Sequence, residues 1–583
     1  MKNKPIKTVL ALLLTTCMLM STACGQNAEK ETQESSVATE NSSAGTSSVA
    51  TEEKVVDKKD LPVLTYMSNS AAITSGLVEG HRSDFFAENG FQLEVWAYSV
   101  EKEGAILASG DLPDIMYVSG NILNTMIEAG MVLNLEEHLD KIPHLNSSPY
   151  MEGAMDLMRK KYSGGTGNAY AIPGEVGEQS VGWADSTDRA PIKLRWDIYE
   201  EIGAPKINNF DDLIDVMEQM VKAHPEEADG TKSYGCYLDN SYDANRWGSI
   251  SLWYGYFGYG KQECPFLGER NEVTGEITSM LTRDSLFYKA LKWYTEINRR
   301  GLMDPDSMNT DRATQAKKVA MVPTGTLPGY APVHYEYYIP GTKIVYDTIL
   351  ETGTGIYLVV SAETEHLEEC LQLLDMWCNP DAVLRMQYGP EGDMWELDES
   401  GNAHITDNLA LWLKAGGSLE KFPMSDGTAY TKWNTPMCVM TGEKTSYGDG
   451  KGGYVYNSVE HWDEVQEILT DNPTFKAWQK TTGYENWKEW LADVGDVYYT
   501  ESAFGNVDAY LTPLTDSQNL TKSSLKNVVV PAAWKMVYSK DDAEFEEIWD
   551  QMVKDCNDLG AKEFLEWRIQ DIENAMKLME ANN

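Results

Sequence analysis

Two sets of side chains in this sequence could do chemistry with a small molecule. Aromatic rings are abundant, at 17 Trp, 31 Tyr and 12 Phe, and there are 91 carboxylates. Rings combined with carboxylates, amides and arginine are typical of sites for sugars, whose C–H faces stack on rings while their hydroxyls form hydrogen bonds. The candidate ligand-binding residues are Trp247, Trp183, Glu175, Trp395, Trp433, Tyr430, Asn69, Asn121 and Arg189.

Carboxylate pairs could instead act as the acid and base of a secreted carbohydrate-active enzyme. Glu391 and Asp393 form such a pair in the sequence. A chain with 91 acidic residues contains such pairs by chance, and the sequence has no Ser/His/Asp, zinc or phosphate-cradling motif. We therefore favour binding over catalysis, with the enzyme as the alternative.

The charge of the chain restricts its partners. The formal net charge is -43 at pH 7. A strongly negative field repels polyanions at long range, which argues against nucleic acid and polyanionic ligands. The sequence therefore favours a neutral ligand.

The first residues predict export. Three lysines precede the apolar run Val9 to Leu14, and small residues follow it, as in a signal peptide over 1–23. Ser21-Thr22-Ala23-Cys24-Gly25 resembles a bacterial lipobox, so we expect Cys24 to carry lipid, including palmitate. Ser21 stands where an aliphatic residue is usual, which keeps ordinary signal cleavage as an alternative. Residues 24–60 have almost no large apolar side chain and predict a disordered tether.

The cysteines of the folded part show no metal-binding spacing. Cys370 and Cys378 would lie roughly 12 Å apart along one helix, too far for a bridge. A disulfide between Cys236 and Cys264 remains open, and we expect buried free thiols. The six cysteines are Cys236, Cys264, Cys370, Cys378, Cys438 and Cys556.

Alternating strands and helices begin the folded part and predict a parallel sheet with crossover helices. Ligands collect at the carboxyl ends of such strands. The polar loops Ser68-Asn69-Ser70 and Ser119-Gly120-Asn121 follow two of them. The expected elements are strands at Pro62 to Met67, Phe91 to Ala97 and Asp114 to Val118, and helices near Ser83 to Ala87 and at Glu101 to Ala108.

Later helices show the same apolar spacing. Asn209 can cap a helix, and Phe287 to Arg300 and His366 to Cys378 predict two more. Asn379 can cap the next helix, with Pro380 in its first turn. The C-terminal part from Asp541 to Met579 predicts further helices.

The strand Gly355 to Ser361 needs a sheet to join. We expect the chain to leave a first lobe near Ile172-Pro173, build a second lobe and return near Gly353. The predicted fold class is α/β with two lobes joined by several hinge crossings around a cleft. The first lobe takes 61–172 and about 353–395, and the second takes 173–352 and about 396–583 with the C-terminal helices.

Several stretches in order resemble the family 1 extracellular solute-binding proteins of ABC transporters, in their longer lipoprotein-type, sugar-binding branch of Gram-positive bacteria. The stretches are "ASGDLPDIMYV" (108–118), "GNAYAIPGEVG" (167–177), "LRWDIYEEIGAPKINNFDDLIDVMEQM" (194–220), "DGTKSYG" (229–235), "ALKWYTEINRRGLMDPDS" (290–307), "YGPEGDMWEL" (388–397) and "SKDDAEFEEIWDQMVKDCNDLGAKEFLEW" (539–567).

The resemblance implies a type II periplasmic-binding-protein-like fold on the extracellular face of the cell membrane, a neutral oligosaccharide as ligand, and ABC permease subunits as partners. A surface peptide-binding lipoprotein is a further alternative. We expect a monomer without a cofactor. Some long members carry a calcium loop, but His224 to Gly235 lacks the alternating ligands and Asp304, Asp306 and Asp311 are a weak substitute, so we expect no required calcium.

The resemblance and the predicted crossings rank the candidate residues. Trp247 follows the expected strand Tyr234 to Leu238 and lies near the start of an expected helix, where the family places residues of the cleft. The rings of "WYGYFGYG" (253–260) continue that helix, and we expect most of them in the core. Trp183 and Glu175 lie near the first crossing, and Trp395 near the last. Trp433 and Tyr430 share a loop without periodicity, while strand-end or post-crossing position selects Asn69, Asn121 and Arg189.

Overall fold

The strands and helices pack around four large hydrophobic clusters. In this computed structural model, the described residues run from 57 to 582 with internal gaps, of which the longer are 179–191, 239–253, 308–317, 323–333, 351–355, 431–458 and 501–506. Two of the clusters cover the two faces of the first sheet. We call the cluster that includes Ile192 and Trp196 the second core, and the cluster that includes Leu384 and Trp395 the third core.

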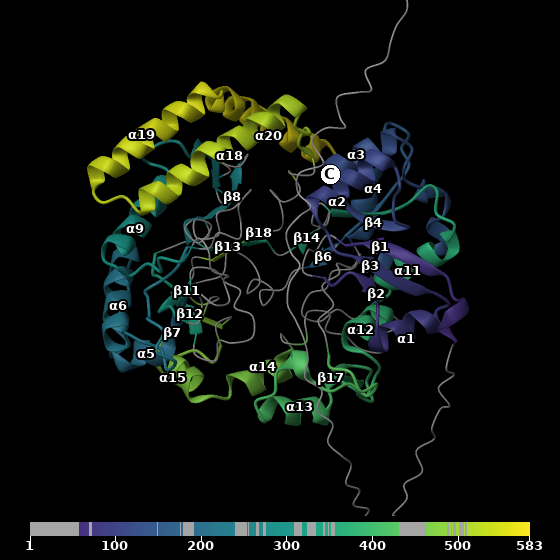
Figure 1. Cartoon of the computed structure of the whole chain (residues 1–583), viewed down its shortest axis with the longest axis horizontal. Coiled ribbons are helices and arrows are strands. Elements are labelled where there is room, and N and C mark those ends of the chain that lie inside the picture. The colour runs from purple at the N-terminus through teal and green to yellow at the C-terminus, as the bar shows by residue number, and fades with distance from the viewer. Residues whose placement is uncertain are drawn as a thin grey trace, which may run out of the picture. The chain divides into compact units, whose positions relative to one another are not determined.

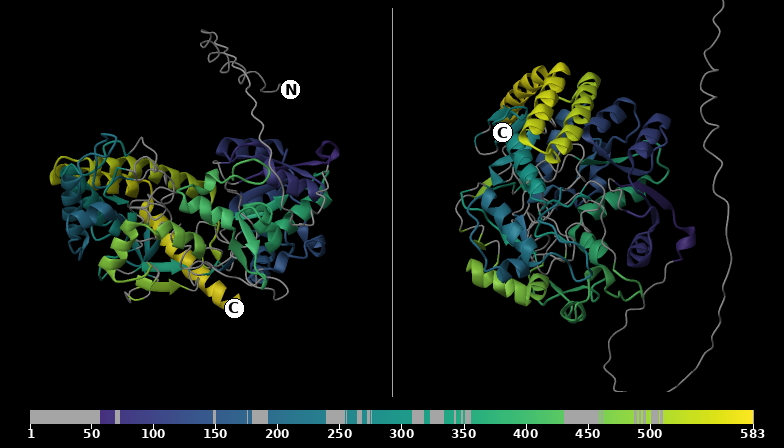
Figure 2. Two further views of the ribbon diagram at one scale, coloured as in Figure 1. Left: turned by 90° about the horizontal axis from the view of Figure 1, so that it is seen from below. Right: turned by 60° about the vertical axis from the view of Figure 1, so that its left-hand side comes forward.

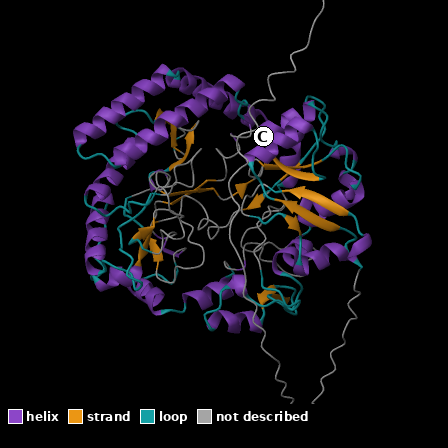
Figure 3. Ribbon diagram, in the orientation of Figure 1, coloured by secondary structure: helices purple, strands orange, loops and turns teal. Residues whose placement is uncertain are grey.

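The first sheet has six strands in the order β2-β3-β1-β4-β15-β5 (Figures 1 and 3). Its strands are β1 Val63–Met67, β2 Gly76–Leu77, β3 Gln92–Trp96, β4 Ile115–Ser119, β5 Ile172–Pro173 and β15 Ile356–Val360. Its helices are α1 Gly80–Glu88, α2 Val100–Ser109, α3 Gly120–Glu128, α4 Met151–Lys161, α11 Leu367–Cys378 and α12 Pro380–Tyr388. The predicted alternation from Pro62 to Val118 is confirmed.

The strand predicted at Gly355 to Ser361 does join this sheet, as β15. It pairs antiparallel with both β4 and β5, and β2 pairs antiparallel with β3. The parallel pairing predicted for the first strands is confirmed at β1, β3 and β4. β15 reaches the sheet after a long excursion rather than through a single crossover helix, and such a crossover is what ties a strand to the parallel sense.

Alternating side chains bury both faces of the first sheet. Ile115 and Tyr117 of β4 pack in one cluster, with α1, α11 and α12. Met116 and Val118 pack in the other, with α2 and α3. This is the period of two that a strand imposes, and it explains why β4 and β15 are nearly continuous apolar runs.

Asp114 ties three distant segments together at the amino end of β4. Its Oδ2 accepts hydrogen bonds from Thr65 N at 2.8 Å and Thr65 Oγ1 at 2.7 Å, and its Oδ1 accepts from Thr364 Oγ1 at 2.6 Å. Its backbone oxygen accepts from Ser361 N at 2.9 Å. One carboxylate thus fixes β1, β4 and the end of β15 relative to one another.

The second core contains most of the remaining helices, including α18 and α19, which pack side by side (Figures 1 and 2). Its helices are α5 Trp196–Glu201, α6 Phe210–Ala223, α9 Leu286–Arg299, α15 Pro473–Thr482, α18 Asp516–Val537, α19 Asp542–Asp558 and α20 Ala561–Asn582. Its strands are β7 Ile192–Arg195, β8 Tyr259–Glu263, β9 Gly268–Asn271, β10 Ile277–Ser279, β11 Met321–Val322 and β12 His334–Tyr337.

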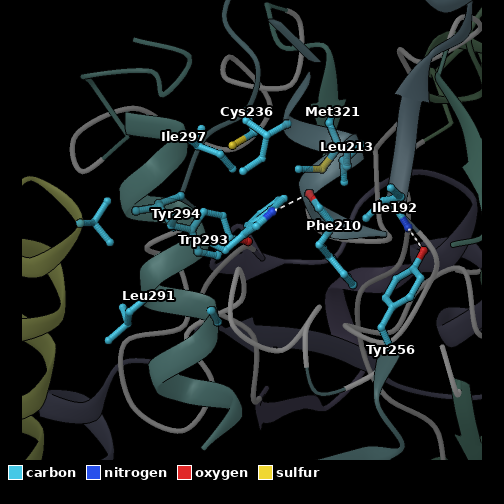
Figure 4. Packing of buried hydrophobic residues seen from close by; sticks show 14 of the residues in the cluster. Ile192, Phe210, Leu213, Cys236, Tyr256, Leu291, Trp293, Tyr294, Ile297 and Met321 are labelled. Atoms are coloured by element: carbon cyan, nitrogen blue, oxygen red, sulfur yellow. Dashed lines mark hydrogen bonds between the residues drawn. The ribbon is translucent and has the colours of Figure 1, made fainter. Parts of the chain in front are cut away.

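Hydrogen bonds as well as apolar contacts hold this core (Figure 4). Trp293 Nε1 donates to Phe210 O at 2.8 Å, and Ile192 N donates to Tyr256 Oη at 2.8 Å. Tyr254 and Tyr256 of the "WYGYFGYG" stretch are buried, as predicted for most of its rings. The polar atoms of these large rings are satisfied without water, so the rings can be buried.

The predicted helix caps are confirmed. The Asn209 side chain accepts from Asp211 N and Asp212 N, and that of Asn379 accepts from Asp381 N, with Pro380 beginning α12. Gly301, with φ 71°, follows Arg300, the C-cap residue of α9. The expected strand Tyr234 to Leu238 is reduced to isolated parallel bridges, Tyr234 with Val319 and Cys236 with Met303.

Two short strand pairs involve segments that leave or re-enter the first sheet. β6 Gly177–Glu178, just after β5, pairs antiparallel with β14 Ile349–Leu350, just before β15. β13 Ile344–Asp347 pairs parallel with β18 Val497–Thr500. The outgoing and returning chain are therefore paired as well as both connected to the sheet.

Cys236, Cys370 and Cys556 are buried free thiols, as expected. Burial raises the pKa of the Cys370 and Cys556 thiols to about 12. They are thus inert packing groups. No helix in the described ranges is long and apolar enough to cross a membrane.

The third core lies between residues Leu384 and Val465. Tyr388, Trp395 and Leu409 pack in it together, so residues on both sides of the expected lobe boundary near 395 share one core. Its elements are β16 Trp395–Leu397, β17 Ala403–Ile405, α13 Asp407–Lys414 and α14 Asp463–Thr470.

His404 links the β16–β17 hairpin to α14. Its Nδ1 lies 2.6 Å from Glu464 Oε1, and its Nε2 lies 3.2 Å from Asp398 Oδ2. These hydrogen bonds raise the pKa of His404 above its ordinary value, and the bond to Glu464 contributes more than the bond to Asp398. The charged imidazolium therefore favours the folded state.

His404→Gln should lower the free energy of unfolding mainly at acid pH. Because the folded pKa is raised, the stabilisation is fully present below the unfolded value of about 6.5 and is lost as pH rises through the folded pKa. The side chain is 43% exposed, so the loss should be only about 0.5 kcal/mol near pH 5.5 and close to zero near pH 9. Urea denaturation at both pH values measures it. Glu464→Gln should flatten the same pH dependence, and an equal loss at both pH values would contradict the assignment.

Candidate functional site

The carboxyl edge of the first sheet is the candidate functional site. β1, β3 and β4 are parallel, and β5 runs in the same sense because both β4 and β5 are antiparallel to β15. All four carboxyl ends therefore lie at one edge, together with the amino end of β15. Ligands of open α/β sheets bind at such an edge.

Three of the predicted residues follow strands that end at this edge. Asn121 is the second residue of α3, directly after β4, although its side chain is outside the described part. Asn69 and Glu175 also fall outside the described residues, one position beyond Ser68 and Gly174.

Trp395 and Tyr430 lie in the third core. Trp395 is 7% exposed, and its Nε1 donates to Gly389 O at 2.9 Å. Tyr430 is 3% exposed, and its backbone N–H donates to Phe422 O at 2.8 Å. Packing accounts for both positions, and a ligand contact by either ring stays a prediction. Trp183, Arg189, Trp247 and Trp433 lie outside the described residues.

A second group of ionisable side chains lies on β7 and β12. Arg195 Nη1 donates to Glu227 Oε2 at 2.7 Å, and its Nη2 donates to Asp197 Oδ2 at 2.8 Å. Lys193 pairs with Glu336 at 3.0 Å. These cations have carboxylate partners, so the group stabilises the second core rather than offering charge to a ligand.

His334 belongs to the same strand pair and lies opposite Arg195. Burial, and then the charge of Arg195, lowers its pKa to about 4. The ring is therefore neutral at physiological pH. It adds no positive charge to the group.

Two acidic residues from the stretches considered for calcium, Asp304 and Glu227, are paired with cations, and Asp311 lies outside the described residues. Asp304 is fully buried, and its Oδ2 lies 2.7 Å from Lys318 Nζ. Glu227, in the stretch His224 to Gly235, accepts from Arg195. Among the described residues, no group of three or more His, Cys, Asp and Glu side chains could hold a metal ion. Independence from calcium remains a prediction.

A close contact fixes the point where the chain leaves the first sheet. Gly174 follows β5, and its N–H donates to Ile356 O at 2.9 Å. A Cβ at Gly174 would lie 1.7 Å from Tyr117 Oη and 3.3 Å from Ile356 O. A side chain at position 174 would have no room beside Tyr117 and Ile356. The chain therefore needs glycine at the point where it leaves β5 at the carboxyl edge.

Sequence reasoning missed Trp96 and Tyr98. Trp96 ends β3, Tyr98 follows it, and both side chains are partly exposed. The strand predicted at Phe91 to Ala97 carries the signal, because its carboxyl end must share the edge with those of β1 and β4. Aromatic residues at that strand end are therefore candidates beside the two polar loops.

The comparisons with known proteins concern the fold. No family model matches the sequence, and no curated protein matches it. The structure is similar to the Streptococcus pneumoniae ABC-transporter substrate-binding protein FusA in complex with kestose, with TM-score 0.57 and 15% identity over 89% of this chain and 100% of that one.

Two further solved structures give the same result. The HMO-binding, ABC-transporter-associated solute-binding protein of Bifidobacterium longum infantis has TM-score 0.56 and 13% identity over 88% of this chain and 99% of that one. The alginate-binding protein AlgQ2 without calcium ion has TM-score 0.56 and 12% identity over 89% and 99%. The fold is the α/β, periplasmic-binding-protein-like fold of extracellular solute-binding proteins of ABC transporters, as the sequence predicted.

Gly174→Ala should destabilise the protein through the contact with Tyr117. Overpacking of this kind costs about 1–3 kcal/mol, measured as the free energy of unfolding in urea. Tyr117→Phe removes the oxygen that the new methyl group would meet, so the double variant should lose less than the sum of the two single losses. Strict additivity would show that the contact does not constrain Gly174.

Proposed function

We propose that this chain is the substrate-binding protein of an ABC importer and that it captures a neutral oligosaccharide. The observation that carries the proposal is the likeness in fold, over 88–89% of the chain, to an HMO-binding solute-binding protein and to a substrate-binding protein in complex with kestose. We expect the two lobes to close over the ligand in the cleft between them. The closed protein would then dock to permease subunits.

The edge of the first sheet supports the proposal. The chain leaves the sheet there at Gly174 and returns there at Ile356. A ligand at this edge would touch the crossing segments as well as the strand ends, so its binding would be coupled to their movement. The net charge of -43 favours a neutral ligand over an anionic one.

We infer that the chain is not an enzyme. Asp393 accepts hydrogen bonds from Ser425 N and, at 2.9 Å, from Ser425 Oγ, and Glu391 accepts from Leu397 N at 3.3 Å. Both carboxylates therefore stabilise turns around the β16–β17 hairpin. The acid and base of a glycosidase flank the bond that is cleaved, whereas these hydrogen bonds direct both carboxylates at groups of the protein itself.

We also propose that Cys24 is lipidated and that residues 24–60 tether the folded part to the outer face of the membrane. The lipobox-like sequence around Cys24 and the polar composition of the following stretch support this. Both lie outside the described residues.

Isothermal titration calorimetry of the purified protein tests the ligand class. The panel should comprise kestose and other neutral di- to hexasaccharides, with peptides of similar size as the matched set. At least one saccharide should bind with a dissociation constant of about 1 μM or tighter and no peptide should bind. If a peptide binds and no sugar does, the chain belongs to the peptide-binding alternative. If the protein turns over a sugar and Glu391→Gln abolishes the turnover, the chain is an enzyme.

Cys24→Ala should abolish palmitate labelling and release the protein into the culture medium. The reason is that a thioether-linked lipid at this residue would be its membrane anchor. Metabolic labelling and fractionation of cells from medium measure the two effects. Cys17→Ala is the matched control and should leave labelling unchanged. Retention of labelled protein in the Cys24→Ala variant would refute the assignment.

A further inference from the structure

We propose that Trp96 is a stacking platform for a sugar ring of the ligand, assisted by Lys102 and Glu103. This inference rests on the proposed function and adds a subsite to it. Trp96 is the last residue of β3, and its backbone oxygen accepts from Ser68 N at 3.0 Å. The ring therefore belongs to the same edge as the loops after β1 and β4.

The ring is held in place before any ligand binds. Trp96 Nε1 donates to Glu94 Oε1 at 3.0 Å, and part of the ring packs against the cluster beneath α2 and α3. The chain beyond it is fixed as well, because Ala97 N donates to Ser75 Oγ at 2.9 Å. A platform with a fixed plane loses little freedom on binding, which favours affinity.

A cation also lies over the Trp96 ring. Lys102 Nζ lies 4.3 Å from the centre of the Trp96 ring. A cation over a partly exposed ring is weakly held, and the unbranched lysine can swing aside. A sugar can then stack its C–H face on the ring while the ammonium donates to a hydroxyl.

Polar groups suited to hydroxyls surround the ring. Tyr98 Oη donates to Glu103 Oε2 at 3.3 Å, a long bond that leaves the carboxylate able to accept from a ligand. Lys102 and Glu103 lie in the first turns of α2, which Ser99 caps by accepting from Lys102 N at 3.1 Å. A ring, a carboxylate, a phenol and an ammonium thus lie within the segment 96–103, which begins at the carboxyl end of β3.

Core packing is the competing explanation for Trp96. Three tryptophans of the hydrophobic clusters, Trp196, Trp377 and Trp478, are 0% exposed, whereas Trp96 and Tyr98 are partly exposed. Partial exposure also occurs at Trp412, which packs in the third core, so exposure alone does not mark a site. What favours a binding role for Trp96 and Tyr98 is their position at the carboxyl end of β3.

Calorimetry on the full mature chain tests the platform, with the neutral saccharide of the panel that binds the wild type most tightly. Trp96→Ala should weaken binding about tenfold or more, whereas Trp96→Phe, which keeps a ring, should stay within about threefold. Trp412→Ala is the matched control, because Trp412 is also partly buried and its Nε1 donates to Ser418 O at 2.8 Å, but it packs in the third core. It should bind like the wild type.

The outcomes separate the two proposals. If the wild type binds a saccharide and Trp96→Ala binds it equally well, the platform is wrong and the proposed function stands. If the wild type binds no saccharide of the panel, the proposed function is wrong and the sugar platform falls with it. Equal losses in Trp96→Ala and Trp412→Ala would indicate general damage and would also refute the platform.

A second measurement does not depend on the folding of Trp96→Ala. In the full chain labelled with 5-fluorotryptophan, the fluorine resonance that disappears in Trp96→Phe identifies Trp96. Saturation of the wild type with the same saccharide should shift this resonance and leave that of Trp412 unmoved. An unmoved Trp96 resonance at saturation would overturn the inference.

Discussion

The position of β15 between β4 and β5 is the constraint on which the rest of the structure depends. It forces the chain to return to its first sheet after an excursion of more than 180 residues, and Asp114 fixes the end of that return by binding Thr65 and Thr364 together. Loop closure over such a distance is entropically unfavourable, so it needs strong local contacts. The alternating apolar side chains of β4 and β15, buried on both faces, supply them.

The antiparallel sense of β15 has a functional consequence. A strand that entered parallel to β4 would begin at the opposite edge, away from the carboxyl ends of β1, β3 and β4. Because β15 is antiparallel, the returning chain arrives at the carboxyl edge, where Gly174 also leaves it. The strand ends and the crossing segments therefore share one edge, and Gly174 lets the outgoing chain pass close to the Tyr117 side chain there.

Local signals predicted much of this fold, and long-range ones did not. Helix caps such as Asn209 and Asn379 act within a few residues, so the sequence alone predicts them. The sense of β15 and the third core depend on partners far along the chain. α18 contains Pro531 within the helix, a residue that normally argues against one. At the site, position after a crossing selected Trp395, but it cannot say which way a ring faces, and the third core holds it.

The charge distribution explains why the edge suits a neutral guest. Two largely buried cations are already paired with carboxylates: Arg195 with Glu227 and Asp197, and Lys318 with Asp304. Arg82 donates to the backbone oxygens of Met386 and Gln387. The excess of carboxylates over cations therefore sets the long-range field, which repels anions but exerts no net force on an uncharged molecule. Affinity for such a molecule must come from short-range stacking and hydrogen bonds, and the partly exposed rings after β3 offer both at the edge where the chain crosses.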